Sequence, residues 1–239
     1  MQLDDYQSIW KRKPVLRRVY SDFYSKINSK LVDGKILEIG GGIGNLLINS
    51  GALIKSDIQI SHGMDVAADA HQLPFQNNVF SNIVLFDVLH HLQCPIVFFR
   101  EAERVLKPGG MIVMIEPGIT PISWFCYKLG HDEPIDMGWG MSESYKRDHK
   151  KDPYDSNQAI PTILFKHSPK LFQAKVKGLD LKDVKWLSLF VYPLSGGFKN
   201  WSLVPLGWID FLLKVERKLL PYLGWLMAFR LMIILEKKQ

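Results

Sequence analysis

The stretch Lys35-Ile36-Leu37-Glu38-Ile39-Gly40-Gly41-Gly42-Ile43-Gly44-Asn45 decides the fold of this chain. Its apolar start is typical of a short parallel strand that is covered on both faces. The glycines that follow can turn the backbone sharply and let a ligand approach it with no Cβ in the way. We therefore predict a strand ending in a carboxylate, then a ligand-binding loop at the carboxyl edge of the sheet. Residues 46–48 are apolar and are expected to start a helix whose first amides face the ligand.

The spacing of the glycines separates two kinds of nucleotide site. A dinucleotide site uses G-x-G-x-x-G and holds a pyrophosphate at a helix N-terminus. This loop has G-x-G-x-G instead, places Asn45 where the third glycine of the dinucleotide pattern would stand, and carries Glu38 two residues before the first glycine. A carboxylate there would repel a pyrophosphate but suits an ammonium or sulfonium group. An NAD-dependent oxidoreductase is therefore the less favoured alternative.

With this loop the chain resembles the class I S-adenosylmethionine-dependent methyltransferases, whose first motif has the form E/D-x-G-x-G-x-G. Three further segments agree with the family in order and spacing. A second apolar strand ends at Asp57, residues 65–75 resemble the third strand and the adenine loop, and residues 81–92 resemble the fourth strand and its active-site turn. The resemblance covers residues 35–117. It implies an α/β fold with a Rossmann-like, seven-stranded, mostly parallel sheet, an antiparallel last strand and helices on both faces.

The resemblance also implies S-adenosyl-L-methionine as the cofactor and assigns residues to its binding. Asp57 would accept both ribose hydroxyls, and an acidic side chain in the third-strand loop would bind the exocyclic amine of adenine. The cofactor-binding residues that follow from the motifs are Glu38, Gly40, Gly41, Gly42, Asp57, Asp69, Ala70 and Phe86.

The implied reaction is methyl transfer by in-line displacement to a small or lipid-linked acceptor, with oxygen preferred as the nucleophile. A hydroxyl acceptor needs a general base, whereas a phenolate, an amine or a stabilised carbanion does not. His90 is the candidate proton acceptor, with pocket shaping as the competing interpretation, and His91 and His131 are weaker candidates. Metal-ligand spacing is absent from the sequence, so no metal is expected. A non-catalytic regulator that binds the cofactor remains the alternative to an enzyme.

Length and composition agree with one domain. With 239 residues and 47% apolar content, the chain can bury one substantial core. We interpret 1–239 as a single methyltransferase domain, in which 35–117 is the cofactor-binding core, 118–160 is a lid and acceptor insertion, and 193–228 is an apolar helical insertion. The N-terminus lacks the pattern of a signal peptide and only two cysteines are present, so we expect a cytoplasmic protein.

Four further elements are predicted outside the core. An N-terminal helix over 7–29 would form the second wall of the acceptor pocket. Ser168 as cap and Pro169 at the first helical position predict a helix that runs to about residue 177. The last two strands are predicted at 184–192 and 229–236.

The insertion between those two strands is unusually apolar and has three interpretations. A transmembrane helix is the least favoured, because Pro221, Gly224 and Arg230 interrupt a run that is already short. The second interpretation is a helical hairpin packed as ordinary core. The third is an exposed amphipathic surface over 201–226 that touches a membrane or a lipid-linked acceptor.

Charge is unevenly distributed along the chain. Residues 35–145 carry 6 Lys and Arg against 12 Asp and Glu, residues 1–34 carry 7 against 4, and residues 146–239 carry 17 against 8. The basic flanks indicate an anionic acceptor or an anionic membrane surface, with ordinary solvated lysines as the competing interpretation. A nucleic acid partner is not expected, because the sequence has no recognition helix, zinc knuckle or basic–aromatic stripe.

Overall fold

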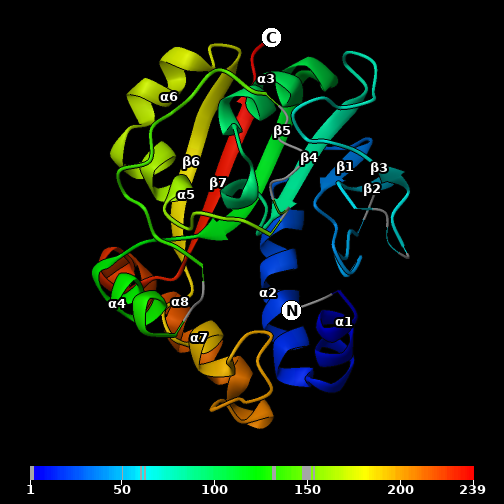
Figure 1. Cartoon of the computed structure of the whole chain (residues 1–239). Coiled ribbons are helices and arrows are strands. Elements are labelled where there is room, and N and C mark those ends of the chain that lie inside the picture. Colours follow the sequence, from blue (N-terminus) through cyan, green and yellow to red (C-terminus); the bar gives the residue numbers. More distant parts are fainter. Residues whose placement is uncertain are drawn as a thin grey trace.

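The computed structural model describes residues 3–49, 51–59, 61, 63–130, 133–146, 152 and 154–239. Its centre is a seven-stranded sheet with the order β3-β2-β1-β4-β5-β7-β6, in which β7 is antiparallel to both neighbours (Figure 1). The strands are β1 (Ile36–Ile39), β2 (Leu53–Asp57), β3 (Val66–Ala67), β4 (Phe80–Phe86), β5 (Leu106–Pro117), β6 (Leu179–Leu187) and β7 (Arg230–Lys237). This order confirms the predicted Rossmann-like architecture.

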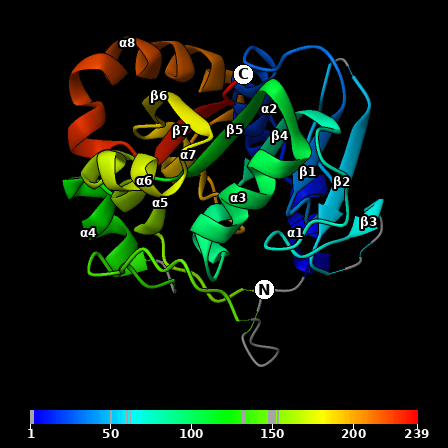
Figure 2. The ribbon, with the colours of Figure 1, turned by 90° about the horizontal axis from the view of Figure 1, so that it is seen from above.

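Two apolar layers cover the two faces of the sheet. Successive side chains of a strand point to opposite faces, so Leu37 packs into one layer and Ile36 into the other. Seen from above, α3 and α6 lie on one side of the sheet and α2 and α8 on the other (Figure 2). The helices are α1 (Leu3–Arg12), α2 (Pro14–Asn28), α3 (Pro95–Val105), α4 (Pro121–Gly130), α5 (Ile160–Thr162), α6 (Pro169–Lys175), α7 (Val191–Ser195) and α8 (Ile209–Met227).

The predicted N-terminal helix over 7–29 is in fact two helices. Pro14 occupies the first turn of α2, and Lys13 before it has φ −111° and ψ 86°, outside the helical region. A proline disfavours the helical conformation of the preceding residue, so the chain breaks there. The second helix then carries an apolar face into the sheet, with Leu16 and Phe23 buried.

The predicted helix after the glycine-rich loop is absent. Residues 41–49 contain only turns, bends and irregular backbone. Positive φ angles at Gly42 and Gly44 oppose a helix there. The Asn28 side chain instead bonds this segment, donating to the Leu47 carbonyl and accepting from the Asn49 amide, both at 2.9 Å. The described part of the connection between β2 and β3 likewise contains no helix.

The strand predicted at 184–192 is wrong in its bounds. The observed strand β6 ends at Leu187, and Ser188 has φ 57°, which terminates it. The buried carboxylate of Glu216 then accepts hydrogen bonds from the amides of Leu189 and Val191, each at 2.8 Å, where the chain turns into α7. The predicted last strand at 229–236 corresponds closely to β7.

The two insertions differ in their helix content. In the first, α4 follows β5 and packs on α8, whereas most of the described chain from 133 to 159 is irregular. In the second, α8 is a single long helix rather than a hairpin, preceded by a 3-10 turn over Leu206–Trp208. Among the described residues, none of the helices is long and apolar enough to cross a membrane.

Candidate active site

The glycine-rich loop follows β1 at the carboxyl edge of the sheet. Gly40 has φ 69°, and a Cβ there would lie 2.3 Å from the Val88 side chain, so only glycine lets the loop pack on the turn after β4. A Cβ on Gly42 would meet no heavy atom closer than 3.9 Å. The loop is therefore held tightly at its start and is open at Gly42, as close approach of a ligand requires. Gly41 lies between them, and a Cβ there would contact Met64 at 2.8 Å.

Glu38 is the most distinctive group of this loop. Its side chain is buried, and Oε2 has no hydrogen-bond partner among the described residues. Burial raises the pKa of Glu38 to about 8, although the nearby Lys55 ammonium acts in the opposite direction. An unsatisfied buried carboxyl oxygen is costly. It fits a ligand that brings a cationic hydrogen-bond donor, such as an amino acid ammonium.

Asp57 lies at the tip of β2, beside the same loop. Its Oδ2 accepts a hydrogen bond from the Gly42 amide at 2.9 Å, and its Oδ1 accepts one from the Gln59 amide at 3.0 Å. The side chain thus ties the first two loops together where the ribose contact is predicted. The structure brings Glu38, the glycines and Asp57 to one edge of the sheet, and their role toward the cofactor stays a prediction.

Asp69, predicted to bind adenine, is bonded within the chain. Its Oδ1 accepts from the backbone amide of His71 and lies 2.8 Å from His71 Nδ1, while the Tyr145 hydroxyl donates to Oδ2 at 2.8 Å. Burial opposes ionisation, yet these bonds lower the pKa of Asp69 well below its ordinary value. The Tyr145 ring stacks on His71 with centroids 3.9 Å apart. The segment predicted as a lid therefore reaches the turn that is predicted to bind adenine, beside the buried Ala70.

Phe86 ends β4 and faces α2. Its ring stacks on Tyr20 with centroids 4.9 Å apart, and it joins an aromatic group with Phe23 and Tyr24. This packing places α2 against the carboxyl end of β4, and its role as a wall of the acceptor pocket stays a prediction. A cofactor contact of Phe86 stays a prediction.

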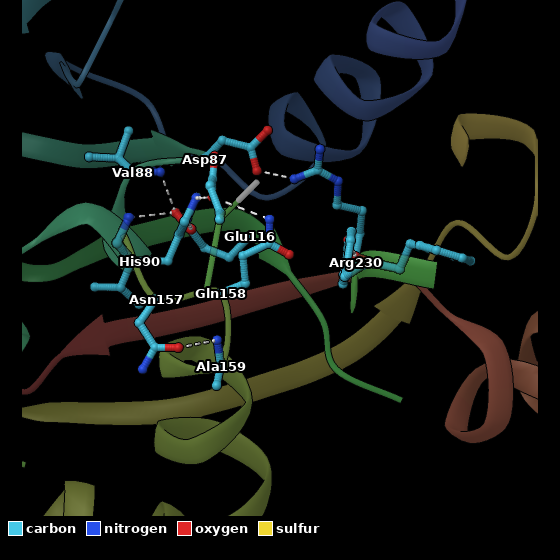
Figure 3. Close-up of polar contacts among 12 residues, drawn as sticks. Asp87, Val88, His90, Glu116, Asn157, Gln158, Ala159 and Arg230 are labelled. Atoms are coloured by element: carbon cyan, nitrogen blue, oxygen red, sulfur yellow. Dashed lines mark hydrogen bonds and ion pairs between the residues drawn. The ribbon is translucent and has the colours of Figure 1, made fainter. Parts of the chain in front are cut away.

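His90 lies in the 3-10 turn after β4 beside Glu116 (Figure 3), and Glu133 lies at its other ring nitrogen. Nδ1 is 2.8 Å from Glu116 Oε2, and Nε2 is 3.5 Å from Glu133 Oε2. Burial alone would lower the pKa of His90, but the two carboxylates raise it to about 9. Both carboxylates thus favour the cationic form of the ring, which cannot take up a proton. This geometry argues against the predicted role of His90 as the proton acceptor.

Glu116 organises the turn that carries His90. It is fully buried at the end of β5, and its Oε1 accepts hydrogen bonds from the amides of Val88 and Leu89, both at 2.9 Å. One carboxylate therefore fixes both the backbone of the turn and the orientation of the imidazole. The sequence contained a signal for this role, because Glu116 is an acidic residue at the end of an otherwise apolar strand.

A second ion pair joins the half-buried Asp87 to the buried Arg230. Asp87 has φ 57°, and its carboxylate bonds Arg230, the first residue of β7 (Figure 3). Arg230 is 4% exposed, lies 4.3 Å from the Tyr192 ring centroid, and its Nε has no partner among the described residues. Burial raises the pKa of Asp87, whereas Arg230 opposes that shift. The ion pair holds Asp87 at the active-site turn, and the sequence did not predict it.

Several side chains that can ligate metals converge at this turn. Donor atoms of His90, His91 and Glu133 lie within 4.8 Å of one another, and so do those of Asp87, His90 and Glu116. They come together through tertiary contacts, so sequence spacing gave no sign of them. Burial lowers the pKa of His91 to about 4, which keeps its ring neutral. The weaker candidate His131 lies outside the described residues.

Comparisons with known proteins match the core of the chain. A family model described as a methyltransferase domain matches residues 49–114. Demethylmenaquinone methyltransferase of Staphylococcus saprophyticus is 40% identical over 75 residues, which are 30% of each protein. The ubiquinone/menaquinone biosynthesis C-methyltransferase UbiE of Coxiella burnetii is 37% identical over 60 residues, which are 24% of each. The matched part of the chain thus spans less than a third of these curated relatives.

Solved structures share the architecture over most of the chain. A chain in the complex of the Haloferax volcanii Trm112 methyltransferase activator superposes with a TM-score of 0.53 and 12% identity, covering 100% of this chain and 98% of the other. Geranyl diphosphate C-methyltransferase of Streptomyces coelicolor superposes with a TM-score of 0.50 and 13% identity, covering 93% of this chain and 77% of the other. At these identities the likeness concerns the fold alone. Residues 49–114 thus match a methyltransferase domain, and the whole chain is similar in fold to the Rossmann-like methyltransferases.

Proposed function

We propose that the protein transfers the methyl group of S-adenosylmethionine to a small hydrophobic acceptor. The observation that carries this proposal is the buried, unpartnered Oε2 of Glu38 beside the open Gly42. A cationic ammonium would satisfy this oxygen and favour its ionised form, whereas the pyrophosphate of a dinucleotide brings no cationic donor to it. The residues present therefore fit an aminoacyl nucleoside better than a dinucleotide.

The chain's own residues would bind and align the two reactants. S-adenosylmethionine, when bound, supplies a methyl group that is activated by the positive charge on sulfur. Glu38 would hold the ammonium, the loop from Gly40 to Gly42 would pack along the ligand, and Asp57 would accept the ribose hydroxyls. Alignment of two reactants can by itself supply roughly 7–11 kcal/mol of the barrier. Positioning is therefore the main catalytic task of this site.

The acceptor side of the site favours a nucleophile that reacts without a histidine acting as general base. His90 is cationic and bonded at both nitrogens. It can donate a hydrogen bond or stabilise negative charge, but it cannot deprotonate an aliphatic hydroxyl. We therefore propose a phenolate oxygen or an electron-rich ring carbon as the methylated atom. The names of the curated relatives, which include a demethylmenaquinone and a 2-methoxy-6-polyprenyl-1,4-benzoquinol methylase, support an aromatic, lipid-linked acceptor of this class.

The proposal is tested with cofactor labelled in its methyl group. The purified protein is incubated with labelled S-adenosylmethionine and a cell extract, which is then split into organic and aqueous phases. We expect label in the organic phase, in a compound whose new methyl group is on a ring carbon or a phenolic oxygen. Label in macromolecules, or tight cofactor binding by calorimetry with no transfer to any fraction, would contradict the proposal. The last result would instead favour a cofactor-binding regulator.

A further inference from the structure

We propose that α4, α8 and the segment 201–208 form a docking face for an anionic lipid membrane. This face is defined by exposed apolar and aromatic side chains on those three segments. The docking face extends the proposed function, because a lipid-linked acceptor would be bound from the membrane at this face. The observations that support the docking face are independent of those that support the proposed function. The exposed side chains of the docking face are Ile122, Trp124, Phe125, Leu129, Trp201, Leu203, Leu206, Trp208, Phe211, Leu219, Tyr222 and Trp225.

One stripe along α8 shows how the face is built. Ile209, Leu213 and Gly224 on the inner side of the helix are buried. The outer side presents Phe211 and Trp225, which are 59% and 64% exposed. Residues spaced by three and four positions share one side of a helix, so the sequence over 209–227 generates two opposite apolar sides. The interpretation of this insertion as ordinary core is therefore wrong for its outer side.

The docking face carries positively charged side chains among its aromatic ones. Lys214 and Lys218 stand between the aromatic residues of the same stripe, and neither forms an ion pair with a described residue. Together with Phe211 they lie on one exposed side of α8. Lys128 on α4 lies 4.5 Å from the Trp124 ring centroid. These cations can reach lipid phosphates while the aromatic rings enter the interface.

Acidic groups do not oppose this charge. The segments 121–130 and 201–227 contain only two acids, Asp210 and Glu216. Asp210 forms an ion pair with Arg18 at 2.5 Å, and Glu216 is buried with its carboxylate bonded to backbone amides. The exposed charge of the face is therefore cationic, which complements an anionic lipid surface and gives a reason to prefer it over an uncharged apolar partner.

The position of the face agrees with access to the site. Figure 1 shows α4, α7 and α8 beyond the ends of β4 and β5 where the active-site turns lie. The helix α8 is also connected to the site along the chain, because β7 begins with Arg230, three residues after α8 ends. A membrane on this face would therefore lie near the acceptor side of the site rather than at the opposite edge of the sheet.

The proposal is tested by sedimentation of the full chain with vesicles. We expect binding to phosphatidylglycerol–phosphatidylcholine vesicles and weaker binding to pure phosphatidylcholine. The double variant Lys214→Gln/Lys218→Gln should weaken the anionic binding roughly 30-fold, from about a fivefold loss for each lysine near an anionic surface. Phe211→Ser/Trp225→Ser should lose binding to both kinds of vesicle. The matched control Lys107→Gln/Lys177→Gln, exposed lysines outside the face, should bind like the wild type.

Three results would overturn the proposal. The first is an unmodified chain that does not sediment with anionic vesicles. The second is a lysine variant that binds as well as the wild type. The third is a dimer in solution that needs Phe211 and Trp225 and excludes vesicle binding. Thermal melts verify that each variant is folded. Because S-adenosylhomocysteine binding is measured on the same samples, a failure of the proposed function is distinguished from a failure of this docking face.

Discussion

At the scale of single residues, Glu38 connects the stability of the free protein with its affinity for a ligand. Its pKa of about 8 means that the free protein keeps this carboxyl protonated at neutral pH because of burial. The unfolded chain ionises it near the ordinary value of 4.5, so the folded state loses stability as the pH rises from that value to about 8. A cationic ligand group beside Glu38 would reverse the shift and expel the proton.

This linkage predicts proton release on cofactor binding. At pH 7 we expect about one proton to be released for each S-adenosylhomocysteine bound, because the ligand ammonium restores the low pKa of Glu38. Calorimetry in phosphate and in Tris at the same pH measures the release, since the two buffers differ in ionisation enthalpy. Glu38→Gln should abolish it and weaken binding. Equal binding enthalpies in the two buffers would show that Glu38 does not meet the ammonium.

Asp57 provides the second prediction at this scale. Asp57→Asn keeps the shape of the side chain but removes the charge that would accept the ribose hydroxyls. We expect cofactor affinity to fall by about 1–3 kcal/mol, the cost of hydrogen-bonding groups left poorly paired. The matched control is Asp180→Asn, because Asp180 is an exposed partner of Lys238 at the far edge of the sheet. If both variants bind equally well, the ribose lies elsewhere.

At the scale of elements, the turn after β4 is fixed by contacts from β5 and β7. The Glu116–His90 and Arg230–Asp87 pairs join residues that are 26 and 143 positions apart. Both pairs are largely buried, so each charge depends on its partner. The turn should therefore respond to mutations in strands that carry no cofactor-binding residue.

His90→Gln tests the first pair. The raised pKa of His90 means that its cationic form stabilises the fold fully below about pH 6.5 and loses this effect as the pH rises through about 9. We expect the variant to lose about 1.5–3 kcal/mol of unfolding free energy at pH 6 and clearly less above pH 9.5. Urea denaturation across this range measures the difference. The exposed His167→Gln is the control, and a pH-independent loss for His90→Gln would refute the ion pair.

Arg230→Met tests the second pair. Removing the guanidinium leaves the Asp87 carboxylate without its buried partner, so we expect a loss of about 3 kcal/mol of unfolding free energy. Asp87→Asn/Arg230→Met should recover part of that loss, because no uncompensated charge remains. A double-mutant cycle in urea gives the coupling energy. Additive effects of the two single changes would mean that the pair contributes nothing to the turn.

At the scale of the whole molecule, the sheet order and the first loop could be predicted from the sequence, because short-range patterns determine them. The buried run Ile36–Ile39 and the glycines after it behave as predicted. The predictions were wrong where contacts with residues distant in the sequence determine the backbone. Asn28 bonds the segment in which a helix was expected. Glu216 bonds the amides just after β6, where the strand was expected to continue. The ion pairs of His90 and Arg230 could not be predicted either, because their partners are distant in the sequence.

We propose above all that the glycine-rich loop after Glu38 binds the aminoacyl nucleoside S-adenosylmethionine. A crystal soaked with S-adenosylhomocysteine tests this binding. We expect the ligand along Gly40–Gly42, with its ammonium within hydrogen-bond distance of Glu38 and its ribose hydroxyls on Asp57. No ligand density at this loop in crystals soaked at saturating concentration, or binding of NADH there in a competing soak, would show that the cofactor site is placed wrongly.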